Sequence, residues 1–584
     1  MSTFAPLSPS LPGTPPSPSP SLSPRSKRVA IIGAGTSGLG ALLALLDLPA
    51  DVRRGWEVEV LERRADVGGV WLPDEHDHPP SSIPETPLYP ALTTNTAVPT
   101  MAFTALPFPP LTPLFPCHTH IRSYLSSVVA RAGLGPYLQL NTGVERAAWE
   151  GGRWVVDLSL SRGGEGGERE RETREYDHLV VATGRYHQPH IPTFPGQDAW
   201  LSSTAAAEEG AGERPQHEIV HSLWYRGPER YAGRVVVVVG FGASGWDVAQ
   251  QVVGVAEKTY HSYVHNDSTP AKLPPVPDTH HVPRISHLTR SAIHFTDGST
   301  IPTPSSADAG AGVSIILCTG YTLSIPFLEP HVLQHAHLSP EAPPSTAQLT
   351  TNGSYLRPLY RQLLVITSPS LGGDTLPPNA LAILGLPWFI AAAQSAYIQG
   401  LVAAHAFAAD DPGKLLPRGT VEGALEELER EEERTREEDG VEPFVVGHKF
   451  TAPGRAESYQ SSLLSLLRLR SSIPLPAHLA DPSVPYVPAW RAWARSPPVF
   501  AALRKAYNRA VSEGVEERFR AQGAAGEGAR ELEEEWVRVM EELVEWGERR
   551  EREDEQRGEG GGEKDGWPEE LVERELEGGL AVEA

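Results

Sequence analysis

The sequence is poor in sulfur, with two cysteines and three methionines among 584 residues. Cys117 and Cys318 are too few for a disulfide framework, a C-x-x-C redox pair or a cysteine-rich zinc site. The adjacent His280 and His281 fall in a proline-rich stretch that we interpret as a loop, and they would need further ligands to hold a metal. No Ser/His/Asp spacing typical of nucleophilic catalysis is present. The cysteine usage fits a reducing compartment, so we expect a cytoplasmic location, with association with the ER membrane as the alternative.

The chain also lacks an unbroken apolar segment of membrane-spanning character. Residues 376–409 carry no charge but include Pro378, Pro387 and Gln394. We therefore predict a short buried strand at Leu381–Leu386, a proline break and a buried Ala-rich helix, rather than a bilayer helix. The Pro- and Ser-rich residues 1–27 contain no apolar core of a signal peptide and are expected to form a disordered tail.

Charge is unevenly distributed along the chain. The formal net charge is −24, and the acidic excess is concentrated in residues 421–440 and 527–584. This acidity describes the C-terminal region and favours no nucleic-acid partner. Residues 530–547 present apolar side chains on one helical face, which predicts an amphipathic helix that packs on the body of the protein or on a partner. That face is formed by Trp536, Met540, Leu543 and Gly547.

A G-x-G-x-x-G motif stands near the N-terminus, in IIGAGTSGLGA, between an apolar run and residues with helical spacing. In such a motif Gly33 permits a tight turn, Gly35 lets the backbone approach a pyrophosphate and Gly38 lets the helix pack on the sheet. The N–H groups at the start of the helix then bind the phosphates. Glu62 ends the following strand, where a carboxylate accepts hydrogen bonds from ribose hydroxyls. This pattern predicts a dinucleotide site.

A second motif of the same kind, RVVVVVGFGASGWDVA, contains Gly240, Gly242 and Gly245. The next strand, about Thr259–His265, ends without an acid. Because an acid there would repel a ribose 2′-phosphate, its absence favours NADP over NAD. Lys258 and His265 either supply positive charge to that phosphate or simply face solvent. Two dinucleotide sites in one chain predict a resident flavin and a nicotinamide.

Two buried strands ending in glycine turns bracket the second motif, one before ATG at Ala182–Gly184 and one before CTG at Cys318–Gly320. We therefore predict an α/β fold with two Rossmann-like, three-layer dinucleotide-binding domains, the second inserted in the first, followed by an α-helical C-terminal extension. The expected boundaries are a tail at 1–27, a first nucleotide domain at 28–195 and 303–410, a second at 218–302, a helical or irregular extension at 411–550 and a disordered acidic tail at 551–584.

The ordered set GAGTSG, LERRADVGGVW, LTTNTAVPTMAF, ATGRY, HSLWYR, GFGASGWDVA and CTGY resembles the flavin-containing monooxygenases. The likeness covers roughly residues 28–330 and continues more weakly to about 400. It implies FAD in the first domain and NADPH in the second. In such enzymes the reduced flavin and O₂ form a C4a-hydroperoxide, which oxygenates a soft nitrogen or sulfur nucleophile, as in N,N-dimethylaniline monooxygenases. The implied partners are a small-molecule nucleophile and O₂, and a homodimer is left open.

The resemblance also implies site residues. Asn95 matches the active-site asparagine, whose amide can donate to the flavin peroxide or the nicotinamide; the alternative is an asparagine that only caps a turn. The expected cofactor-binding residues are Gly33, Gly35, Thr36, Ser37, Gly38, Glu62, Arg63, Gly69, Val70, Trp71, Thr94, Asn95, Ala182, Thr183, Gly184, His221, Tyr225, Arg226, Gly240, Gly242, Ala243, Ser244, Gly245, His265, Thr319 and Gly320.

The sequence departs from the family at two places. The F-x-G-x-x-x-H-x-x-x-Y/F fingerprint keeps only His221 and Tyr225, with Pro215 and His217 at its first two positions, and His265 stands where the family usually has a phosphate-binding arginine. Two alternatives stay open: a Baeyer–Villiger ketone oxygenase, and a non-catalytic FAD/NADP-binding protein that acts through its acidic C-terminal helices. A flavin disulfide reductase is excluded because no vicinal thiol pair is present.

Overall fold

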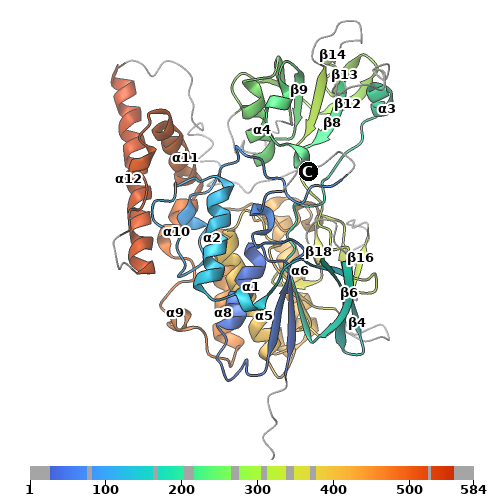
Figure 1. Cartoon of the computed structure of the whole chain (residues 1–584), viewed down its shortest axis with the longest axis vertical. Helices are drawn as coiled ribbons and strands as arrows, with labels where there is room; N and C mark the ends of the chain where they lie inside the picture. Colours follow the sequence, from blue (N-terminus) through green and yellow to red (C-terminus); the bar gives the residue numbers. More distant parts are fainter. Residues whose placement is uncertain are drawn as a thin grey trace, which may run out of the picture.

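A computed structural model describes residues 26–74, 82–161, 169–202, 216–264, 275–303, 312–336, 348–367, 376–523 and 528–557. The mixed α/β class with C-terminal helices is confirmed (Figure 1). The sheet around the first glycine motif is parallel except at β19 and β20, and the sheet around the second is parallel throughout. The first sheet has seven strands in the order β19-β20-β21-β7-β1-β2-β3. Its strands are β1 (Arg28–Ile32), β2 (Glu57–Leu61), β3 (Leu138–Gln139), β7 (His178–Val181), β19 (Leu359–Tyr360), β20 (Leu364–Val365) and β21 (Leu381–Ile383).

The second sheet has five parallel strands in the order β11-β10-β9-β15-β8. They are β8 (His217–His221), β9 (Val235–Val239), β10 (Lys258–Ser262), β11 (His280–Val282) and β15 (Val313–Leu317). In the chain they all fall between β7 and β21 of the first sheet. Both sheets have near-continuous apolar central strands because each strand is covered on both faces.

Sheet pairing differs from the sequence-based boundaries at one place. The sequence assigned residues from 303 onward to the first unit, but β15 pairs in parallel with β8 and β9 of the second sheet. Apolar strands of the two sheets look alike in sequence, so the pattern could not assign β15. His280 and His281 lie in strand β11 rather than in a loop. The remaining domain boundaries stay a prediction.

The helices that cover the two sheets are α1 (Thr36–Leu46), α2 (His118–Arg131), α3 (Gln197–Leu201), α4 (Ala243–Val253) and α5 (Ala392–Ala408). The predicted strand, proline break and buried helix of residues 376–409 are confirmed by β21 and α5, which is buried along nearly its whole length. Of the helices in the described residues, none combines the length and apolar character needed to cross a bilayer.

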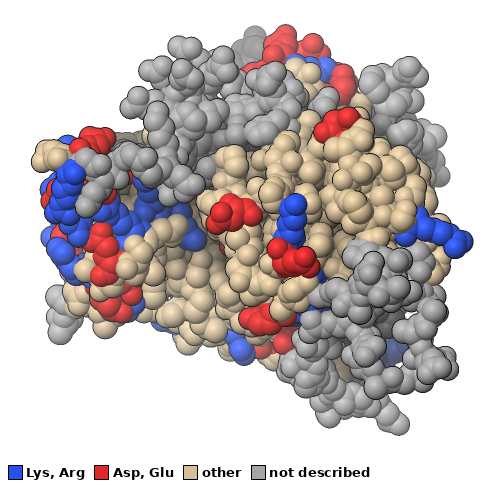
Figure 2. Space-filling view, turned by 90° about the horizontal axis from the view of Figure 1, so that it is seen from above, with Lys and Arg blue, Asp and Glu red and all other residues tan. Residues whose placement is uncertain are grey.

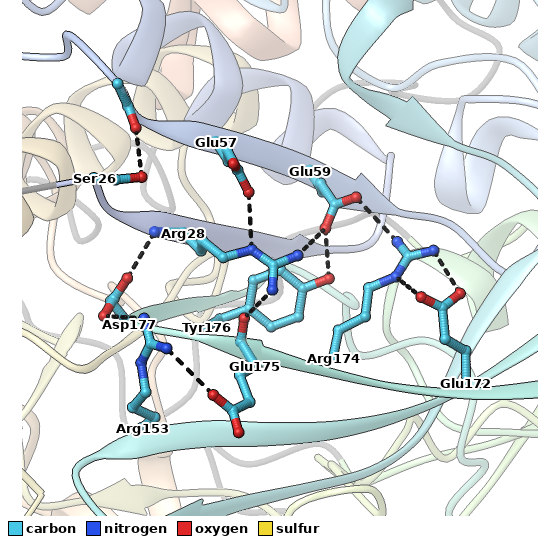
Figure 3. Close-up of polar contacts among 11 residues, drawn as sticks. Ser26, Arg28, Glu57, Glu59, Arg153, Glu172, Arg174, Glu175, Tyr176 and Asp177 are labelled. Carbon is cyan, nitrogen blue, oxygen red and sulfur yellow. Dashed lines mark hydrogen bonds and ion pairs between the residues drawn. The ribbon is translucent and has the colours of Figure 1, made fainter.

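Three small sheets complete the strand structure. They are formed by β4 (Thr142–Glu150), β5 (Arg153–Ser161) and β6 (Arg169–Tyr176); by β12 (Ile285–Thr289), β13 (Ala292–Phe295) and β14 (Thr300–Pro302); and by β16 (Leu333–His335), β17 (Leu349–Thr351) and β18 (Leu356–Arg357). A polar network ties the β4–β6 sheet to the N-terminal ends of β1 and β2 (Figure 3). The Asp177 carboxylate accepts from the Arg28 backbone at 2.7 Å, and Arg174 pairs with Glu59 at 3.0 Å. The network lies at the end of β1 away from its glycine turn.

The C-terminal region is helical. Its elements are α6 (Val421–Asp439), α7 (Pro443–Val446), α8 (Arg455–Arg470), α9 (Ala477–Ala480), α10 (Ala489–Arg495), α11 (Pro497–Ser512) and α12 (Ala529–Arg557). The predicted amphipathic helix is confirmed as α12, which buries Trp536, Met540 and Leu543 against the body of the protein. It continues to Arg557, past the residue at which the sequence placed a disordered tail; residues 558–584 lie outside the described part.

Some acidic side chains of residues 421–440 form ion pairs within the protein. On α6, the Glu432 carboxylate is buried and accepts from the Arg357 guanidinium at 2.7 Å and from the Tyr355 hydroxyl at 3.1 Å. Seen from above, side chains of both signs gather over the side of the molecule where α11 and α12 lie (Figure 2). Part of the acidity of these helices is therefore paired with arginines inside the protein.

Candidate functional site

Each glycine turn is built against the end of a neighbouring strand. Gly33 has φ +104°, and a Cβ there would lie 2.7 Å from the carbonyl oxygen of Ala182. Gly240 has φ +108°, and its Cβ would lie 2.5 Å from the carbonyl oxygen of Cys318. The Gly33 turn therefore packs directly against the ATG segment, and the Gly240 turn packs directly against the CTG segment. Only glycine adopts this conformation at this distance without strain.

The helices that leave the two turns begin with free N–H groups. The N-cap positions of α1 and α4 are Gly35 and Gly242, neither of which caps the helix with a side chain. The first helical residues, Thr36 and Ser37 on α1 and Ala243 and Ser244 on α4, therefore present unsatisfied backbone donors at the positive end of the helix dipole. The α1 pair is half-buried and the α4 pair is exposed. The two turns therefore share the same backbone conformation, but the start of α1 is less exposed to solvent than the start of α4.

Glu62 lies at the first turn with its carboxylate buried. One oxygen accepts from the backbone N–H of Ala34 at 2.7 Å, and the other from that of Arg64 at 2.9 Å. Each oxygen keeps a lone pair for a further donor, as a ribose hydroxyl would supply. The neighbouring Arg63 pairs with Glu85, and 57% of its side chain is exposed.

The segment Gly69–Trp71, a short 3₁₀ helix, covers the first turn. A Cβ on Gly69 would lie 2.8 Å from the Cα of Gly35, so the two backbones are in contact. Arg64 fixes this segment by donating to the carbonyls of Leu72 and Pro73, both at 2.6 Å, and burial lowers the pKa of its guanidinium. The carbonyl of Val70 accepts from the Thr86 hydroxyl at 2.6 Å.

A cavity of about 160 Å³ lies beside this segment. Trp71, Met101, Phe108 and Tyr124 give it an apolar wall, and Arg495 of α10 is the charged residue that reaches it. The Arg495 guanidinium donates to the Phe389 carbonyl at 2.8 Å and pairs with Glu457 at 3.2 Å. Sequence reasoning missed Arg495 because a single arginine in a charged helical region carries no motif.

Asn95 lies in an exposed position next to buried Thr94. In the described part of the chain its amide makes one hydrogen bond, accepting from the Thr96 hydroxyl at 3.1 Å. The backbone around it is held firmly: the Thr94 N–H donates to Pro116 at 2.9 Å, and the Thr94 carbonyl accepts from Arg504 of α11 at 2.7 Å. The Asn95 side chain is thus free to meet a ligand while its backbone is fixed.

The side chains of the HSLWYR segment are engaged within the protein. His221 accepts from the Leu223 N–H at 3.1 Å and contacts the Gly320 carbonyl at 2.9 Å, and burial lowers its pKa to about 4. The Tyr225 hydroxyl donates to Gln251 at 3.0 Å. Arg226 pairs with Asp74 at 3.0 Å and also donates to the Leu223 carbonyl. These contacts favour a framework role over direct cofactor contact.

The residues expected near a ribose 2′-phosphate lie in different surroundings. Of the two alternatives for Lys258, its position favours the solvent-facing one, because Lys258 is exposed and pairs in register with Val235 at the start of β9, the end away from the Gly240 turn. Its ammonium lies over the Tyr260 ring. His265 and Pro215 lie outside the described residues. His217 stacks on Trp200 with ring centroids 4.3 Å apart.

Two adjacent segments connect the two glycine-turn units. The chain leaves the first unit after Thr183 and Gly184 and returns after Thr319 and Gly320. These crossings pair with one another: the His190 N–H donates to the Gly320 carbonyl at 2.9 Å, and the Thr319 hydroxyl donates to the His190 carbonyl at 2.5 Å. The segments that follow ATG and CTG are therefore held together by hydrogen bonds between His190 and residues 319–320.

Two dinucleotide-type turns in one chain, one half-buried and one exposed, are typical of oxidoreductases that use a flavin and a nicotinamide. A family model described as flavin-binding monooxygenase-like matches residues 26–267. The chain is therefore similar to flavin-containing monooxygenases over this region, which is less than half of its length.

Individual relatives are similar over part of their length. The flavin-containing monooxygenase ustF1 of Aspergillus flavus is 32% identical over 250 residues, 42% of this chain and 56% of the relative. The thiol-specific monooxygenase of Saccharomyces cerevisiae is 28% identical over 314 residues, 52% of this chain and 63% of the relative. The S-allyl-L-cysteine S-oxygenase of Allium sativum has the same fold, with a TM-score of 0.59 and 21% identity over 90% of this chain and 100% of that one.

Proposed function

We propose that this chain is an FAD- and NADPH-dependent monooxygenase that transfers one oxygen atom of O₂ to a soft nitrogen or sulfur nucleophile. The observation that carries the proposal is the pair of glycine turns with different enclosure: Thr36 and Ser37 are half-buried, whereas Ala243 and Ser244 are exposed. An enclosed turn suits a resident flavin. An open turn suits a nicotinamide that must bind and leave in each cycle.

The first turn fits FAD in three respects. Its helix begins without a side-chain cap, Gly35 and Gly69 leave only backbone at the closest approach, and Glu62 retains lone pairs for ribose hydroxyls. These are the contacts that a pyrophosphate and a ribose require. FAD, when bound, supplies the electron transfer from NADPH to O₂.

The chain's own residues act on this chemistry by excluding water and holding hydrogen bonds. Trp71, Met101 and Phe108 form an apolar wall beside the first turn, which keeps bulk water from the reacting atoms. Asn95 offers an amide that donates a hydrogen bond without acting as an acid. Arg226 and Asp74 connect the second unit to the segment that covers the first turn.

Sulfur is the first substrate class to test because the relative from S. cerevisiae is described as thiol-specific. The Baeyer–Villiger alternative requires the same two cofactors and is distinguished by offering a cyclic ketone beside a thioether and a tertiary amine. The non-catalytic alternative is less favoured, because helices α10 and α12 pack on the segment that follows Asn95 instead of forming a separate output module.

Two matched glycine exchanges test the assignment of cofactors. Gly33→Ala places a methyl group 2.7 Å from the Ala182 oxygen and is expected to give protein without FAD. Gly240→Ala places one 2.5 Å from the Cys318 oxygen and is expected to retain FAD that NADPH reduces at least tenfold more slowly. Visible absorbance and anaerobic reduction rates provide the readout. Reduction of Gly240→Ala at the wild-type rate would contradict the assignment.

A further inference from the structure

Four contacts attach the C-terminal helices to the loop that carries Asn95. The Arg504 guanidinium of α11 holds Thr94, as described above, and also donates to the Thr93 hydroxyl at 3.3 Å. Helices α10 and α12 pack on the short helix Val98–Thr100. The backbone N–H of Leu111 donates to Ala521 at 2.7 Å, and the Phe115 and Tyr507 rings lie 5.1 Å apart.

Arg504 fixes this loop through hydrogen bonds, and the nearby Asp247 carboxylate also attracts its charge. In the described part of the chain no carboxylate forms an ion pair with it. Its guanidinium lies over the Phe115 ring at 5.0 Å, and burial lowers its pKa. A desolvated guanidinium that donates to a carbonyl makes a strong, directional hydrogen bond. The carbonyl that it holds precedes Asn95 directly.

Helix α12 fixes α11 in turn. A Cβ on Gly547 would lie 2.7 Å from the Cβ of Ala506, so the two helices are in close contact. Arg509 pairs with Asp554 at 2.6 Å. Figure 1 shows α11 and α12 lying side by side along the edge of the molecule. A continuous set of contacts therefore leads from the last described helix to the residue beside Asn95.

We propose that Arg504 is a positioning residue, through which the C-terminal helices hold the Asn95 amide in the geometry that couples NADPH oxidation to oxygen transfer. This rests on the proposed function. The rate of oxygen transfer is expected to depend strongly on where the Asn95 amide lies. A displacement of about 1 Å near the reacting atoms lowers rates by up to about a hundredfold.

The test compares Arg504→Gln, Arg504→Lys and the control Lys505→Gln in the FAD-loaded full chain. Lys505 is the adjacent residue, and its pair with Glu551 is half-exposed, so its loss should change little. Thioanisole is the probe substrate, and the ratio of sulfoxide to hydrogen peroxide formed per NADPH is measured. Amide hydrogen exchange of residues 92–102 gives a second readout that is independent of turnover.

For Arg504→Gln we expect FAD content and anaerobic reduction by NADPH to stay at the wild-type level. The ratio of sulfoxide to peroxide should fall about tenfold, and exchange of residues 92–102 should accelerate. Arg504→Lys should recover part of the ratio, and Lys505→Gln should match the wild type.

An Arg504→Gln variant with wild-type coupling and exchange would overturn the proposal, as would a parallel loss of FAD, reduction and coupling. If the wild-type protein makes no sulfoxide and consumes no NADPH, the proposed function fails. The exchange measurement still decides in that case whether Arg504 fixes the Asn95 loop.

Discussion

Buried histidines are the residues whose ionisation responds most directly to this fold. Burial lowers the pKa of His178, His221 and His405 to about 4, and that of His448 to about 3. An exposed histidine has a pKa of about 6.5, so these side chains are neutral in the folded protein where they would be charged in the unfolded chain. The folded state binds fewer protons below neutral pH and loses stability there.

His405 is the buried histidine best suited to test this loss of folding stability at acidic pH. Its Nδ1 contacts the Ser471 hydroxyl at 2.7 Å, whereas its buried Nε2 has no hydrogen-bond partner among the described residues. The unfolded state gains a proton at this residue between about pH 6.5 and pH 4, so stability falls by about 1.4 kcal/mol per pH unit for each such group. We expect His405→Gln, which cannot titrate, to have a shallower loss of stability over this interval. Denaturant unfolding at pH 7 and pH 5 measures the difference, and equal losses in both proteins would contradict the argument.

At single residues, the sequence predicted what depends on local backbone geometry. Gly33, Gly240 and Glu62 lie where their motifs placed them because a tight turn fixes its neighbours. Arg226 was expected from its motif to bind a cofactor, and its ion pair with Asp74 could not be foreseen. Arg504 carries no motif, and tertiary packing brings Thr94 to it, so in the sequence it looks like an ordinary surface arginine.

At the scale of elements, the close pair α1 and α5 sets the geometry of the first turn. Gly40 and Gly400 let the two helices approach until a Cβ on Gly400 would lie 2.8 Å from the Cα of Ala41. The start of α5 lines the cavity next to Thr36 at the start of α1. A change in their separation therefore alters the cofactor site as well as the core.

Gly400→Ala tests this packing. Alanine improves helix propensity by about 1 kcal/mol, but overpacking against backbone costs roughly 1–3 kcal/mol. Because the contacting Ala41 atom is backbone and cannot move aside, we expect net destabilisation and weaker retention of FAD. The control is Gly254→Ala, where φ is −74° and a Cβ meets nothing within 4 Å, so stability should hold or rise slightly. Thermal unfolding of both holoproteins gives the answer; a stable Gly400→Ala protein would refute the close-packing argument.

Elements with a clear period were predictable, whereas their assignment to sheets was not. The runs that became β1, α1, β9 and α4 follow directly from apolar patterning around the glycine turns. The sheet that β15 joins depends on long-range pairing with β8 and β9, which leaves no mark in the strand's own residues. Helix α6 shows the same limit, because its acidic residues look solvated until Arg357 is brought to Glu432.

At the scale of the whole molecule, the C-terminal helices are part of the folded body. The alternative raised from composition, in which the acidic C-terminal helices act apart from oxygenation, is not favoured by their packing. Trp536, Met540 and Leu543 of α12 are buried against the body of the protein.

A truncation pair measures how far oxygenation depends on α12. A chain ending at residue 527 loses α12 and exposes the apolar face of α11, whereas a chain ending at residue 557 keeps both helices. We expect the shorter chain to unfold several degrees lower and to couple NADPH oxidation poorly, because burial of one large apolar side chain alone contributes about 1.5–3 kcal/mol. The longer chain should behave as the full protein does. Equal coupling in both chains would show that α12 is dispensable.

The measurement that tests the central claim most directly is reduction of the purified holoprotein by NADPH without oxygen, followed by mixing with air-saturated buffer and thioanisole. We predict that the flavin absorbance bleaches with NADPH and returns with oxygen, and that about one sulfoxide forms per NADPH consumed, as transfer of one oxygen atom requires. Bound flavin that NADPH does not reduce, or full reoxidation to hydrogen peroxide without any oxygenated thioether, amine or ketone, would contradict the monooxygenase account.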